Sequence, residues 1–176
     1  PGARAVRDEL GPVPAYTILP AAPADFPAIT EHSAELPSAE FQAHTIEEGV
    51  PASGSELTPE VNPLELRLER FISFTKGCYI GQEVIARIDS YKKLQRNLSG
   101  FIFEEAGKRP ERAGKIFDGE DEVGWTTRHC RSERLAAEIA LGFLDTGTAP
   151  GKALAFDPGN GARLPVRATA LPFSAA

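Results

Sequence analysis

The second half of the chain is divided into six short apolar segments, and this division constrains the fold more than any other feature. Glycine, proline, aspartate and asparagine lie between the segments, and these residues favour tight turns over continuing helices. Six short strands close into a small barrel or pack as a sandwich. We therefore expect no long helix inside residues 98–172. The segments are Leu98 to Phe103, Lys115 to Phe117, Val123 to Thr127, Glu138 to Leu144, Ala153 to Phe156 and Arg163 to Leu171.

The first 96 residues are predicted to contain both strands and helices. The segment from Ala15 to Leu19 reads as a strand. Ser38 is placed to cap a helix through Glu48, with Gly49 in the position that favours a left-handed turn. A further helical turn is expected from Thr58. The predicted fold is thus α+β, with an α+β region over residues 1–96 and a small C-terminal β-barrel over 97–176.

A turn between a strand and a helix is predicted near the middle of the chain. Phe71 to Thr75 is a β-type run, and Val84, Ile85 and Ile88 mark one apolar face of a helix that reaches about Ser90. The turn between them reads Lys76-Gly77-Cys78-Tyr79-Ile80-Gly81-Gln82-Glu83. This stretch is locally basic, because residues 76–96 carry 5 basic and 2 acidic side chains.

Cys78 is the candidate reactive group of this turn. The positive end of a helix dipole and the ammonium group of Lys76 both favour the thiolate form, which is the nucleophilic form of cysteine. The alternative is a small buried apolar side chain, as cysteines often are. Local sequence favours neither interpretation, so Cys78 and Lys76 enter as candidate catalytic residues.

The other polar residues of the turn also have two interpretations each. Gly81 allows a ligand to approach the backbone or simply permits the turn. Tyr79 stacks on a flat ring or packs in the core. Glu83 is better explained by the first turn of the helix than by ligand contact, and Arg87 pairs with it or binds an anion.

Composition excludes several classes of protein. There is no apolar run of about 18 residues and no apolar N-terminal leader, so we expect no membrane contact and a reducing compartment, the cytoplasm or a mitochondrial matrix. Two cysteines without Cys-x-x-Cys spacing argue against a disulfide framework and against a self-contained zinc site. The net charge of -6 argues against non-specific nucleic-acid binding. The sequence contains no methionine, which fits a fragment or a processed chain.

The run from Phe74 to Arg87 resembles the signature of YgfZ-type proteins, which share the fold of the glycine-cleavage T-protein, an aminomethyltransferase. The segments around Gly54-Ser55-Glu56-Leu57-Thr58 and Gly124-Trp125-Thr126-Thr127 are similar to the family as well. The family implies two α+β subdomains and a β-barrel around a tetrahydrofolate site. This chain resembles only the latter portion, so a separate N-terminal portion or a second copy is an expected partner.

Two departures from the family accompany the resemblance. Members often carry arginine where this chain has Thr45, so one guanidinium is missing. The loop from Thr126 to Glu133 also departs from the Thr-Ser-x-x-x-Ser-Pro pattern of the family's barrel. The resemblance implies tetrahydrofolate as cofactor, with Tyr79, Gly81, Gln82, Glu83 and Arg87 as candidate cofactor-binding residues, and no metal site.

Three functions compete at this point. The resemblance favours a folate-binding factor for assembly or repair of iron–sulfur clusters, with iron–sulfur proteins as partners and indirect effects on tRNA modification. A folate-dependent aminomethyl or one-carbon transferase is the main alternative, and a tRNA-binding module is the third. Cys78 favours the first, because a single thiolate can hold a cluster or a sulfur species while a partner supplies the other ligands.

Overall fold

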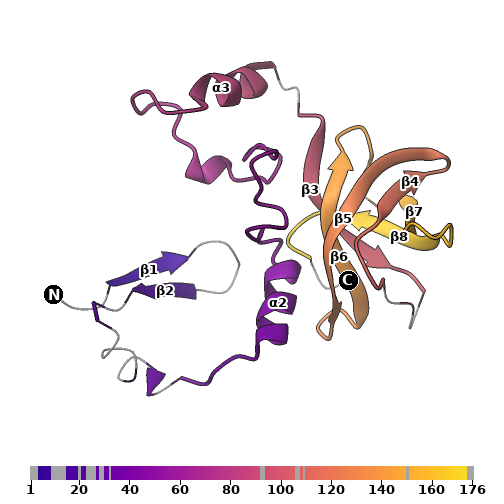
Figure 1. Ribbon diagram of the computed structural model, residues 1–176, viewed down its shortest axis with the longest axis horizontal. Coiled ribbons are helices and arrows are strands. Elements are labelled where there is room, and N and C mark those ends of the chain that lie inside the picture. The colour runs from indigo at the N-terminus through magenta and orange to yellow at the C-terminus, as the bar shows by residue number, and fades with distance from the viewer. Residues whose placement is uncertain are drawn as a thin grey trace.

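The computed structural model of the chain describes residues 4–8, 15–19, 21–22, 27, 30–31, 33–91, 94–105, 108, 110–149 and 151–173. The N-terminal elements are the antiparallel hairpin of β1 (Arg4–Asp8) and β2 (Ala15–Leu19), helix α2 (Ser38–Glu47), the 3-10 turn η2 (Glu69–Phe71) and helix α3 (Gln82–Tyr91). Figure 1 shows α2 next to a barrel, with the hairpin and α3 lying away from that barrel.

A closed six-stranded barrel forms the C-terminal half. Its strands are β3 (Arg96–Phe103), β4 (Lys115–Asp118), β5 (Asp121–Ser132), β6 (Ala137–Asp145), β7 (Ala153–Asp157) and β8 (Leu164–Thr169). The order is β3-β6-β5-β4-β7-β8, and β3 closes the ring by pairing antiparallel with both β6 and β8. Each predicted apolar segment corresponds to one of these strands. The α+β fold with a small C-terminal β-barrel is therefore confirmed.

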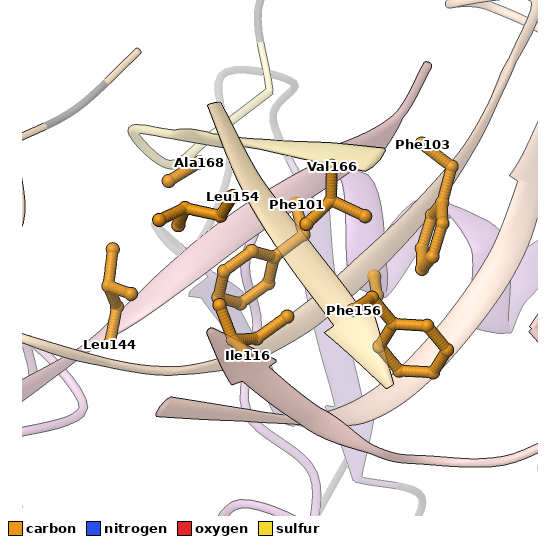
Figure 2. Packing of buried hydrophobic residues seen from close by; sticks show 9 residues of the cluster. Phe101, Phe103, Ile116, Leu144, Leu154, Phe156, Val166 and Ala168 are labelled. Carbon is orange, nitrogen blue, oxygen red and sulfur yellow. The ribbon is translucent and has the colours of Figure 1, made fainter. Parts of the chain in front are cut away.

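The barrel interior is filled by large apolar side chains. Phe101, Ile116 and Phe156 are completely buried. Figure 2 shows Phe101 beside Ile116, with the Phe156 ring on the side of Phe103. Close approach of β5 and β6 depends on glycine. A Cβ on Gly124 would lie 2.2 Å from the carbonyl oxygen of Phe143, and one on Gly142 would lie 2.1 Å from that of Trp125. Only residues without a side chain fit where two strands press together this closely.

Helix α2 joins the barrel through Ile46. This side chain is 2% exposed and lies in a cluster with Ile139, Leu141 and Phe173. Gly49 follows the helix with a φ of 70°, as the sequence predicted for this position. The predicted helix start is off by one residue, since Ser38 is the first helical residue and Pro37 stands in the capping position without a side-chain cap.

Three sequence-based expectations are wrong in detail. Residues 71–75 form no strand, because no strand lies beside them in the described part of the chain to complete a ladder. Strand β5 continues past Thr127 to Ser132, since β6 offers it partners as far as Ala137. The segment from Thr58 forms irregular turns. Within the described residues, no helix is long and apolar enough to cross a membrane.

Candidate functional site

The segment from Lys76 to Gly81 is an irregular loop that leads into α3. The Lys76 N–H donates a hydrogen bond to Ser73 Oγ at 3.1 Å, which holds the loop's first turn. Cys78 is exposed and lies four residues before Gln82, where α3 begins. The prediction of a turn between a strand and a helix is therefore wrong, because no strand directly precedes the loop in the part of the chain that the structure describes. Cys78 also lies outside the first turn of the helix. Its exposure also overturns the interpretation of Cys78 as a buried apolar side chain.

The side chains of Lys76 and Tyr79 contact each other within the loop. Lys76 Nζ lies 4.7 Å from the centre of the Tyr79 ring, a geometry in which the ammonium is attracted by the ring face. The Tyr79 hydroxyl is buried and has no hydrogen-bond partner in the described part of the chain. Tyr79 is thus half-buried, with one ring face occupied by Lys76 and one polar atom still to be satisfied.

The remaining candidate residues line the start of α3. Gly81 has a φ of 88° and open space where a side chain would be. Gln82 is half-buried, whereas Glu83 and Arg87 are exposed. Among the described residues no ion pair joins Glu83 to Arg87, so the arginine remains available to an anion. The structure places these groups together at the N-terminal end of α3. None of them lines either of the two clefts described below.

Exposed apolar side chains are spread over the pre-barrel part of the chain, from the β1–β2 hairpin to α3. Among the described residues, every exposed large apolar side chain lies before the barrel, and Ile80 in the loop is fully exposed. Large apolar surface exposed on a folded chain commonly contacts another surface. The exposed apolar side chains are those of Tyr16, Ile18, Leu19, Leu36, Phe41, Leu57, Phe71, Phe74, Ile80 and Val84.

A buried ion pair connects the pre-barrel segment to the barrel. The Glu56 side chain is completely buried and accepts hydrogen bonds from Arg128 Nε at 3.0 Å and from the Ala52 N–H at 2.9 Å, as well as one from the Thr127 hydroxyl. Burial opposes ionisation of Glu56, but the hydrogen bonds from Arg128, Thr127 and Ala52 outweigh it and hold the pKa of this carboxyl below its usual value. Glu56 is therefore an anion at neutral pH.

Arg128 also contacts the end of α2, where the family often carries an arginine at position 45 and this chain has Thr45. Its Nη1 donates to Thr45 Oγ1 at 3.1 Å, and its Nη2 donates to the Val50 carbonyl. A guanidinium from β5 therefore contacts the Thr45 side chain directly.

A second network is centred on Glu47, the last residue of α2. Glu47 accepts hydrogen bonds from the Ser132 hydroxyl and from Arg134 Nε, the latter at 2.8 Å. Arg134 also donates to the Phe173 carbonyl at 3.1 Å. Cys130 falls in the stretch from Thr126 to Glu133 that the sequence suggests is a loop. It lies instead within β5, half-buried and paired in register with Ile139.

Comparison with known proteins agrees with this architecture. Residues 96–174 match the family described as the glycine cleavage T-protein C-terminal barrel domain. An aminomethyltransferase of Aquifex aeolicus is 37% identical over 100 residues, which is 57% of this chain and 27% of that protein. An aminomethyltransferase of Corynebacterium aurimucosum is 33% identical over 131 residues, or 73% of this chain and 34% of that protein. These matches support the glycine cleavage T-protein superfamily.

The fold comparison extends over more of this T-protein-like chain. The glycine cleavage system aminomethyltransferase T from Bartonella henselae has a similar fold, with a TM-score of 0.73 and 20% sequence identity over 89% of this chain and 45% of that one. The chain spans only about a quarter to a third of the length of the two sequence relatives above. No group of three or more histidine, cysteine or acidic residues suited to a metal ion occurs among the residues that the structure describes.

Proposed function

We propose that this chain is the C-terminal part of a tetrahydrofolate-dependent one-carbon transferase of the T-protein superfamily. The observation that carries the proposal is the extent of the match to an aminomethyltransferase. At 131 residues it is longer than the barrel domain alone. It therefore includes pre-barrel residues that the Glu56–Arg128 pair ties to the barrel.

Tyr79, Gly81, Gln82, Glu83 and Arg87 would form one wall of the folate site. The buried Tyr79 hydroxyl without a partner and the open space over Gly81 fit a planar ligand that carries hydrogen-bonding groups. Arg87 is exposed and suits the carboxylate of a folate tail. When bound, tetrahydrofolate would supply the nitrogen atoms that accept the one-carbon unit. The chain's own residues orient it and exclude water on one side.

The exposed apolar side chains indicate what would form the opposite wall. They lie on the pre-barrel part that carries the candidate folate residues. We propose that a further α+β portion, or a second copy of this chain, packs there and completes the pocket. A pocket with one wall buries too little of a ligand to hold it tightly.

A YgfZ-type role in iron–sulfur cluster maintenance is the second candidate, and the exposure of Cys78 favours it. Cys78 and Lys76 would then be the reactive pair, and iron–sulfur proteins would be the partners. Effects on tRNA modification would follow through cluster enzymes, in the cytoplasm or a mitochondrial matrix.

A genetic experiment in the source organism separates the two functions. We would replace Cys78 by serine at the chromosomal locus and compare that strain with a strain that lacks the gene. The transferase proposal predicts that deletion abolishes tetrahydrofolate-dependent formation of one-carbon units from an aminomethyl donor, and that the serine strain keeps this activity. Loss of iron–sulfur enzyme activity in both strains, with one-carbon formation intact, would establish the second candidate instead.

A further inference from the structure

Arg67 has an unusual backbone conformation, and its guanidinium forms no ion pair within the described residues. Its φ of 58° lies in the left-handed region, which it shares with Ala136 alone among the described residues other than glycine. Its side chain is exposed, and no ion pair or side-chain hydrogen bond engages its guanidinium within the described residues. A strained position that holds an unpaired cation is a reason to look for a ligand.

Arg67 lines a cleft of about 140 Å³ between the pre-barrel segment and the rim of the barrel. Asp145, at the end of β6, lines the same cleft and likewise has no ion pair in the described part of the chain. The other lining residues carry no charge, and Asn97, Thr148 and Thr169 are among those with hydrogen-bonding side chains. The cleft thus combines one cation, one anion and several neutral groups in a volume well below that of typical drug-sized sites.

We propose that this cleft binds a small zwitterion of the α-amino acid class. The carboxylate of the ligand pairs with the Arg67 guanidinium, which offers two parallel N–H donors. The ammonium group of the ligand pairs with Asp145. A simple anion would be repelled by Asp145 and a simple cation by Arg67, so a ligand that carries both charges is favoured over either. The proposal is independent of the folate function.

A structural role for Arg67 is the competing explanation. Arg67 also lines a second cleft of about 120 Å³ together with Glu48. Glu48 Oε2 is buried and has no hydrogen-bond partner in the part that the structure describes. No ion pair within 4 Å joins Arg67 to Glu48. If Arg67 nevertheless serves mainly to compensate this carboxylate, its removal must destabilise the protein.

Binding is tested on the intact chain with three matched probes. L-Alanine carries both charges, propionate carries the carboxylate alone, and ethylamine carries the ammonium alone. We expect L-alanine to raise the thermal unfolding midpoint in a saturable way, because it binds the folded state. The same concentrations of propionate and ethylamine are expected to leave the midpoint unchanged.

Two variants complete the test. Arg67→Gly relieves the left-handed strain, so we expect a higher midpoint without ligand and no response to L-alanine. Asp145→Asn is expected to keep the midpoint and to weaken the response to L-alanine at least about tenfold, since a hydrogen bond to a charged group is lost. An equal response to all three probes would overturn the proposal, as would a lower midpoint or a preserved L-alanine response in Arg67→Gly.

Discussion

At the scale of single residues, Glu56 has the most constrained chemistry in the molecule. It has no exposed surface, and its carboxylate receives charged and neutral donors from β5 and from the loop before it. An ion pair buried in this way adds little net stability compared with an apolar pair, but loss of one partner leaves a buried charge uncompensated. Glu56 therefore holds the pre-barrel segment in place.

We predict that Glu56→Gln lowers the free energy of unfolding by about 3 kcal/mol, because Arg128 then keeps its charge without a counterion. Urea unfolding measures this. Glu122→Gln is the matched control. Its carboxylate pairs with Lys115 at 2.6 Å, but both side chains are well exposed, so its loss should cost less than about 1 kcal/mol. Equal effects of the two substitutions would show that the Glu56 pair holds nothing in place.

The lowered pKa of Glu56 also predicts a pH dependence. Below the ordinary glutamate range the unfolded chain takes up a proton at Glu56 more readily than the folded chain, so protonation favours unfolding. The stability from this group is complete above the ordinary glutamate pKa and is lost as pH falls toward the lowered folded value. The difference in unfolding free energy between the parent and Glu56→Gln should shrink across that acidic window. A constant difference would contradict the assignment.

The two cysteines are predicted to differ in reactivity. Cys78 is exposed in a loop, whereas Cys130 is half-buried within β5. We expect iodoacetamide to modify Cys78 several times faster at neutral pH, as followed by mass spectrometry of digested protein. Cys78→Ser should change the free energy of unfolding by less than about 0.5 kcal/mol, since the site is on the surface. Faster labelling of Cys130 would contradict this prediction.

At the scale of elements, α2 depends on the barrel more than on its own sequence. Its side chains are mostly exposed, and Ile46 is the apolar residue that it buries against Ile139 and Leu141. We predict that Ile46→Ala lowers the unfolding free energy by about 2–4 kcal/mol. Val84→Ala removes methyl groups from an exposed helix position and should change it by less than about 0.5 kcal/mol. Similar decreases in unfolding free energy for the two substitutions would mean that Val84 on α3 is also buried against another part of the protein.

The same contrast explains which elements the sequence could predict. The barrel strands carry their own signal, because short apolar segments alternate with turn residues such as Gly119 and Gly151, both of which have positive φ. The expected strand at 71–75 failed, because strand formation depends on a partner that sequence-local patterns do not reveal. The extension of β5 was missed because its polar residues look like a loop until their partners are known.

The candidate site was predicted unevenly for a related reason. Residues of the Lys76–Glu83 motif are adjacent in sequence, so resemblance was enough to single them out. Glu56 and Arg128 are 72 positions apart, and Glu47 and Ser132 are 85 apart. No pattern of neighbouring residues in the sequence indicates that these side chains pair. The available signal was the acidic residue Glu56 itself, which lies between Ser55 and Leu57 in a segment rich in turn residues.

At the scale of the whole molecule, the chain combines a well-packed barrel with a pre-barrel part that exposes apolar side chains. We predict that the isolated chain binds tetrahydrofolate weakly, with a dissociation constant above about 100 μM, because one wall buries too little of the ligand. Isothermal titration calorimetry under anaerobic conditions measures this. Micromolar affinity of a monomer would show that the pocket is complete without a partner surface.

The central claim is that the segment from Lys76 to Arg87 forms one wall of a folate site. Hydrogen-exchange mass spectrometry of the protein purified from its source, with and without tetrahydrofolate, tests this claim most directly. The account predicts slower exchange at residues 76–87 in the presence of tetrahydrofolate. It predicts unchanged exchange at β4 and β7, neither of which pairs with β3 in the barrel. Unchanged exchange at 76–87 with saturating tetrahydrofolate, or protection confined to the barrel, would contradict it.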